Sequence, residues 1–233
     1  MSVLLLRFAG PMQAWGDSSR FNHRATRREP TKSGVFGLLA AAQGRRRSDP
    51  LEDLLDLRFG VRTDQVGRVI TDFQTEIDWR TGKSKALTYR DYLADARFLV
   101  VIEGNRTFLE SLEAAVKSPA YPLFLGRRSC PPSGNITLGI HEQTLDKALV
   151  NHEWLAATWY RKKQPARVQL AISRDQLPGE QADEFIRDVP VNFEQRHRQH
   201  NLRGVVHRFT PLFENPDGRQ TRDHNPFELI GGA

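Results

Sequence analysis

Residues 96–117, ARFLVVIEGNRTFLESLEAAVK, decide the fold class because they place a buried strand directly before an amphipathic helix. Ala96 to Glu103 has the length of a strand and contains the continuous apolar run from Phe98 to Ile102, which predicts a buried strand. Asn105 to Lys117 repeats apolar residues at helical spacing instead, on the face that carries Phe108, Leu109, Leu112 and Val116. This strand–helix pair predicts a protein that mixes both kinds of element.

The same order of elements occurs earlier in the chain. Ser2 to Phe8 is an apolar run typical of a buried strand, and a helix starts near Thr31 and stops at Gly44. Phe59 to Thr63 then alternates like a strand, and Ile136 to His141 supplies a last one. We therefore expect an α+β fold with a ferredoxin-like βαββαβ core.

Two segments fall outside this core. Between about residues 66 and 95, β-forming residues flank a Thr-Gly-Lys turn, which predicts a protruding hairpin, or thumb, inserted into a domain spanning 1–145. The less regular pattern over 146–233 predicts a smaller C-terminal β-rich lobe.

No stretch approaches the ~20 apolar residues of a membrane helix, and a single cysteine, Cys130, fits a reducing compartment. We expect a cytoplasmic protein with no membrane partner.

Basic residues are clustered along the chain. The formal charge is +6, from 34 basic and 28 acidic residues. The clusters are Arg20, Arg24, Arg27, Arg28 and Lys32; Arg45, Arg46 and Arg47; and Arg196, His197, Arg198, His200 and Arg203. Such clusters suit a polyanionic partner, although arginine-rich loops can also be merely solvated.

The strongest local signal is Pro30-Thr31-Lys32-Ser33-Gly34, at the start of the helix. A helix start offers unpaired N–H groups and partial positive charge, so hydroxyls, a lysine and a glycine there suit a phosphate. An ordinary N-cap by Thr31 or Ser33 explains the same residues. The spacing of a Walker loop is absent, so no nucleotide hydrolysis is implied.

Two further glycine-flanked segments carry candidate contacts. Gln13 and Trp15, within GPMQAWG, could hydrogen-bond to and stack on a splayed base, although Trp15 could equally anchor the core. Arg127 and Arg128 follow Gly126 in YPLFLGRRSCPPSG, where adjacent arginines can hold phosphates or stack on bases.

Together, LLLRFAGPMQAWG, PTKSGVFGLLAAAQG, TYRDYLADARF and YPLFLGRRSCPPSG closely resemble the CasD family, in order from about Leu4 to Leu149. CasD proteins are subunits of Cascade, the type I-E CRISPR surveillance complex of antiviral defence. The resemblance implies a RAMP protein with an RRM-like core and a thumb, which binds and caps the 5′ handle of the crRNA. It also implies contacts with the CasC backbone subunit, the CasA large subunit and other Cascade subunits, with target DNA involved only indirectly.

The chemistry of the residues and the resemblance to CasD proteins together predict one set of RNA-contacting residues. Its members are Gln13, Trp15, Arg24, Arg27, Arg28, Thr31, Lys32, Ser33, Gly34, Lys83, Arg90, Tyr92, Arg127 and Arg128. The thumb residues of this set could wedge at the junction of handle and spacer, while Tyr89 and Tyr92 could equally pack the base of the thumb.

The main rival is a metal-independent endoribonuclease that processes precursor crRNA, as a type I-C relative does. Its candidate groups, His23, Lys32, Tyr89 and His141, form no recognisable triad in the sequence. Cysteine and histidine spacings typical of metal sites are missing as well. We expect a non-catalytic protein with no metal and no cofactor.

Overall fold

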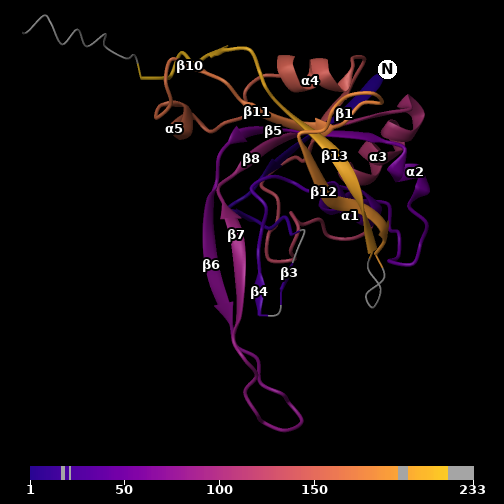
Figure 1. Cartoon of the computed structure of the whole chain (residues 1–233), viewed down its shortest axis with the longest axis vertical. Helices are drawn as coiled ribbons and strands as arrows, with labels where there is room; N and C mark the ends of the chain where they lie inside the picture. The colour runs from indigo at the N-terminus through magenta and orange to yellow at the C-terminus, as the bar shows by residue number, and fades with distance from the viewer. Residues whose placement is uncertain (17–18, 21, 194–198, 220–233) are drawn as a thin grey trace, which may run out of the picture.

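The computed structural model describes residues 1–16, 19–20, 22–193 and 199–219. Its main sheet has seven strands in the order β12-β13-β11-β5-β8-β1-β9 (Figure 1). Four of them come from the first part of the chain: β1 (Ser2–Ala9), β5 (Arg58–Gln65), β8 (Arg97–Gly104) and β9 (Thr137–His141). Neighbouring strands run antiparallel throughout this sheet. The predicted α+β class is confirmed.

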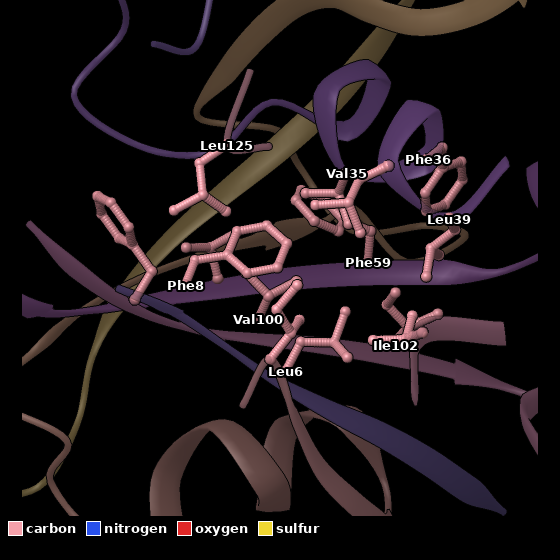
Figure 2. Close-up of a cluster of buried hydrophobic side chains, with 14 of the residues drawn as sticks. Leu6, Phe8, Val35, Phe36, Leu39, Phe59, Val100, Ile102 and Leu125 are labelled. Atoms are coloured by element: carbon pink, nitrogen blue, oxygen red, sulfur yellow. The ribbon is translucent and has the colours of Figure 1, made fainter. Parts of the chain in front are cut away.

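The central strands carry buried apolar side chains on both faces of the main sheet. On β1, Leu4 and Leu6 point to the side covered by α1 (Lys32–Ala42) and α3 (Arg106–Lys117), where they meet Val35 and other core residues (Figure 2). Val3 and Leu5 point to the opposite side, which α4 (Leu145–Asn151) covers. Because strand side chains alternate between the two faces of a sheet, a continuous apolar run such as Val3 to Leu6 places apolar side chains on both faces.

Side chains cap the two longest helices. Thr31 accepts from the Gly34 N–H at the start of α1, and Asn105 accepts from the Phe108 N–H at the start of α3. Each satisfies a helix donor that has no partner within the helix. Between them in the chain lies α2 (Glu52–Leu55), a short helix with no side-chain cap. Within the described part of the chain, no helix is long and apolar enough to cross a membrane.

The C-terminal part extends the main sheet. It adds β11 (Ala171–Asp175), β12 (Glu184–Asn192) and β13 (Gln199–Phe209), and β11 pairs directly with β5. The segment 176–190 is rich in acidic residues, and its last part, from Glu184, lies in the edge strand β12. A short helix α5 (Thr158–Arg161) and a small sheet of β10 (Arg167–Val168) and β14 (Phe213–Glu214) complete this part. A domain boundary near residue 145 stays a prediction.

A second sheet stands apart from the main one. Its longest strands, β6 (Arg68–Gln74) and β7 (Thr88–Ala94), form an antiparallel hairpin that projects from the body (Figure 1). Three two-residue strands complete this sheet. β2 (Met12–Gln13) and β4 (His23–Arg24) pair with β7, and β3 (Ser19–Arg20) pairs with β4. The basic segment after β1, which has no periodicity in sequence, thus gains order by pairing with the hairpin.

Candidate nucleic-acid interface

The three glycine-flanked segments pack against one another. A Cβ atom on Gly10 would lie 2.9 Å from the Pro131 carbonyl oxygen, and one on Gly34 would lie 2.9 Å from the Trp15 ring. Gly126 has φ +89°, and a Cβ there would lie only 1.7 Å from the Ala14 carbonyl oxygen. Glycine is needed at these contacts because no side chain fits. The segments form one unit, although the sequence separates them widely.

Gln13 and Trp15 anchor this unit from inside. The Gln13 Nε2 donates to the Ala96 carbonyl at 2.8 Å, and the Trp15 Nε1 donates to Gln13 Oε1 at 3.0 Å. The Trp15 ring stacks on Phe8 with centroids 5.5 Å apart. Both side chains are buried with their polar groups in use, so the structure favours the core-anchor alternative over base stacking.

The start of α1 already holds a protein carboxylate. The Lys32 backbone N–H donates to Asp188 Oδ2 at 2.8 Å, the position that a phosphate would take. The Lys32 Nζ lies 2.8 Å from Asp175 Oδ2 and 3.2 Å from the Leu57 carbonyl oxygen. Thr31 acts as the ordinary N-cap. Lys32 and Thr31 are buried, so in this structure neither is presented to RNA.

Arg203 joins the two carboxylates at this helix start. Its Nη2 lies 2.8 Å from Asp188 Oδ2, its Nε lies 2.9 Å from Asp188 Oδ1, and its Nη1 lies 3.0 Å from Asp175 Oδ1. Two cations and two carboxylates thus share a buried environment. Such a set is stable only while all its members are paired. Arg203 belonged to the third basic cluster of the sequence, and Arg196, His197 and Arg198 of that cluster lie outside the described residues.

The remaining arginines gather where β4 meets β7. These two strands pair in parallel, with Arg24 opposite Arg90. Arg127 crosses this junction, donating to the Asp91 carbonyl and to the Arg24 carbonyl, each at 2.9 Å. Its guanidinium lies 4.7 Å from the centre of the buried Tyr92 ring. Arg127 and Tyr92 thus hold the basic loop on the hairpin, and Tyr92 packs the base of the hairpin.

The predicted set divides by exposure. Gln13, Trp15, Thr31, Lys32 and Tyr92 are buried. The half-buried members are Arg27, Ser33, Gly34, Arg90 and Arg127, and the exposed members are Arg24, Arg28, Lys83 and Arg128. Arg24, Arg90 and Arg127 come together, and the exposed Arg128 follows Arg127 in the chain. Lys83 lies at the far tip of the hairpin, and Arg27 lies 2.9 Å from Glu184.

Comparison with known proteins identifies the family. A family model described as CRISPR-associated protein (Cas_Cas5) matches residues 3–206. The chain belongs to this family. A curated relative of this Cas5-family protein, the CRISPR system Cascade subunit CasD of Escherichia coli (strain K12), is 38% identical over 183 residues, which cover 70% of this chain and 82% of the relative. The resemblance to CasD proteins is confirmed.

Two solved structures match nearly the whole Cas5-family chain. A chain of a CRISPR RNA-guided surveillance complex superposes with a TM-score of 0.72 at 28% identity and covers 98% of both chains. A second structure, described as the crystal structure of Cas protein, superposes with a TM-score of 0.69 at 35% identity. It covers 94% of this chain and 98% of that one.

A histidine–aspartate pair sits next to the arginines of this Cas5-family protein. His23 Nε2 lies 2.9 Å from Asp91 Oδ2, and Thr71 Oγ1 donates to Asp91 Oδ1 at 2.8 Å. Burial raises the pKa of Asp91, but these two hydrogen bonds lower it, and the pKa ends below its ordinary value. Asp91 therefore stays ionised and orients the His23 ring. The sequence offers no signal for this pair, since 67 residues of chain lie between its members.

Arg80 is a further candidate contact that the predicted set does not include. Its guanidinium lies 5.1 Å from the ring centre of Trp79, which is 85% exposed at the hairpin tip. The adjacent tryptophan and arginine in the sequence could have marked this stacked pair. Among the described residues, no group of three or more histidine, cysteine or acidic side chains is arranged to hold a metal ion.

Proposed function

We propose that this protein is the non-catalytic RNA-binding subunit of a type I-E Cascade complex, where it grips the 5′ handle of the crRNA. The observation that carries the proposal is the arginine surface of Arg24, Arg90 and Arg127, with the exposed Arg128 next in the chain, in a protein 38% identical to a CasD protein. Handle RNA is single-stranded, so its phosphates need cations that are spaced along a strand and open to solvent. Arg24 and Arg128 are exposed and can supply such cations, whereas the start of α1 is filled by Asp188.

The proposal includes a ferredoxin-like core. Its strands would be β1, β5, β8 and β9, and its helices α1 and α3, a βαββαβ order that the pairing β5-β8-β1-β9 supports. The β6–β7 hairpin would be the thumb inserted between the middle strands. Its position between β5 and β8 in the chain fits this role.

The hairpin has two chemically different faces. Register places Arg90 and Ile70 on the face of Arg24, and places Phe73 opposite Tyr89 on the other face. Phe73 is 61% exposed and Tyr89 is 45% exposed. We propose that the arginine face meets the handle, and that the aromatic face meets a neighbouring Cascade protein. The CasC backbone subunit is our candidate there, with CasA seated through the assembled complex and target DNA involved only indirectly. We place the assembly in the cytoplasm.

Nuclease activity is the less favoured function. Of its four candidate groups, only His23 and Tyr89 are neighbours, opposite each other on β4 and β7. Lys32 is enclosed in ion pairs, and His141 lies on β9, at the edge of the other sheet. Lys32, the lysine among these four candidates, therefore does not lie beside His23, where it could balance charge on a cleaved phosphate.

The test combines binding and cleavage. Labelled repeat RNA is incubated with the purified protein in EDTA, and its affinity is measured at several salt concentrations. Arg24→Ala with Arg128→Ala should flatten the plot of log affinity against log salt by about 1.4, or ~0.7 per lost phosphate contact on a single strand. Arg46→Ala with Arg47→Ala removes the same charge from a different exposed loop and should leave the slope unchanged.

Two results would contradict the proposal. An unaltered slope in the Arg24 and Arg128 variant would remove the arginine surface from the phosphate contacts. A discrete cleaved product from the unmodified protein, absent in a His23→Ala variant, would show that the protein is a nuclease.

A further inference from the structure

A second basic and aromatic surface lies on α5 and the turn that follows it. We call it the α5 patch, made of Trp159, Lys162 and Lys163. Trp159 is 48% exposed, and the Lys163 Nζ lies 5.0 Å from its ring centre. Both lysines are exposed, and among the described residues neither has a carboxylate within 4.0 Å. Unpaired cations beside an exposed indole are the combination that holds single-stranded nucleic acid.

The α5 patch stands on a fixed base. Arg161 turns inward, where its Nε donates to the Ala156 carbonyl at 3.0 Å and its Nη2 donates to the Trp154 carbonyl. The Asn215 side chain in turn donates to the Arg161 carbonyl at 2.9 Å. These bonds fix the backbone of the short helix, so the neighbouring exposed side chains are presented from a defined position.

A cavity of about 240 Å³ opens beside the patch. Its lining includes Trp154, Tyr160, Leu170 and Phe209 as apolar groups, and Gln164 and Asp64 as polar ones. Trp159 meets Tyr160 edge-on, with ring centres 5.8 Å apart, so the aromatic surface continues from the patch into the cavity. The cavity is smaller than the ~300–1,000 Å³ typical of drug-sized ligands, and it suits one planar ring.

The patch adjoins the base of the β6–β7 hairpin. The Val66 backbone N–H donates to the Tyr160 hydroxyl at 3.4 Å, and β6 begins two residues later at Arg68, which is exposed. Figure 1 shows α5 near the end of the hairpin that joins the body. The helix α5 contains no acidic residue, so it would not repel a strand of RNA that leaves the hairpin at this end.

We propose that the α5 patch is a second RNA subsite, which holds a single-stranded segment continuous with the handle. Lys162 and Lys163 contact its phosphates, Trp159 stacks on one base, and the adjacent cavity encloses another. The inference rests on the proposed function, because the first subsite on the hairpin brings the RNA here. An acidic protein segment would use the lysines, but it would leave the ring-sized aromatic cavity unexplained.

Two RNAs separate this subsite from the first one: the handle alone, and the handle with a single-stranded RNA tail. Lys162→Ala with Lys163→Ala should bind the handle alone as the unmodified protein does. It should bind the tailed RNA several-fold more weakly, with a salt slope reduced by about 1.4, or ~0.7 per phosphate. The charge-matched control, Arg46→Ala with Arg47→Ala, should bind both RNAs normally.

Tryptophan fluorescence gives an independent readout. The tailed RNA should quench the unmodified protein more than the handle alone does, and Trp159→Leu should remove the difference. Equal affinity and slope for the tailed RNA in the lysine variant and the control would overturn the inference, and such a result would leave an acidic protein as the partner to test. Failure of the unmodified protein to bind either RNA would refute the proposed function itself and this subsite with it.

Discussion

Asp188 should matter more for folding than for RNA binding. In Asp188→Ala, Arg203 loses two hydrogen bonds of 2.8 and 2.9 Å and the Lys32 N–H loses one of 2.8 Å, all inside the fold. Removing one partner of a buried ion pair costs about 3–5 kcal/mol, because the other charge stays buried. This is a large part of the ~5–15 kcal/mol that stabilises a typical protein.

Urea unfolding measures this loss directly. At ~2–4 °C per kcal/mol for a chain of this size, thermal unfolding should also occur about 6–20 °C lower. Asp188→Asn keeps an acceptor for Arg203 and should lose about 1–3 kcal/mol. Arg45→Ala breaks the more exposed pair with Asp53 and should cost about 1 kcal/mol or less.

A free energy of unfolding for Asp188→Ala within about 1 kcal/mol of that of the unmodified protein would contradict this role, because a surface ion pair ordinarily contributes that much. A changed salt slope for handle RNA binding by Asp188→Asn, under conditions where the variant is fully folded, would contradict it as well. That result would mean that the start of α1 contacts phosphate after all. A stability loss with an unchanged slope separates the two roles of this helix start.

Three further predictions concern individual residues. Gly126→Ala should destabilise the protein by more than about 2 kcal/mol in urea unfolding, and Gly82→Ala by about 1 kcal/mol, because both have positive φ but only Gly126 faces a carbonyl at contact distance. The Arg174 hydrogen bond, followed by the Leu177 N–H and the charges of Arg174 and Arg208, lowers the pKa of Glu180 from 4.5 to about 2. This carboxylate therefore adds stability above pH 4.5 that is lost as the pH falls toward 2. Acid unfolding of Glu180→Gln should accordingly be flatter in this window, and an identical acid profile would argue against the pairing. Burial raises the pKa of Cys130, so its thiol should react with iodoacetamide only after unfolding in urea, and rapid labelling of the native protein would contradict its burial.

Local sequence was sufficient for most of the core elements. The strand predicted over 96–103 is β8, observed over Arg97–Gly104, and the periodic segment that follows it is α3 with Asn105 as its cap. These elements are predictable because their signals, hydrophobic period and capping residue, lie within a few neighbouring positions. The basic segment 12–30 lacked such a signal, since its short strands depend on β7, which lies more than 60 residues away.

The candidate site was predictable by residue type and much less by role. Arg24, Arg90 and Arg127 meet at one place on the hairpin, as a polyanion-binding protein requires. Gln13 and Trp15 have the same chemical capability, yet they are directed inward by hydrogen bonds to each other and to Ala96. A sequence shows which groups can bind a base, while exposure depends on which segments pack over them.

The sequence by itself determined the α+β class, the family resemblance and the positions of the core strands and helices, because each rests on local periodicity or on ordered motifs. Tertiary structure alone decided what occupies the start of α1. Asp188 lies 156 residues from Lys32 in the chain, and pairing of β12 with β13 and packing of β12 on α1 bring it there. A helix start attracts any anion, so only the folded arrangement could determine that a protein carboxylate, and not a phosphate, takes this position.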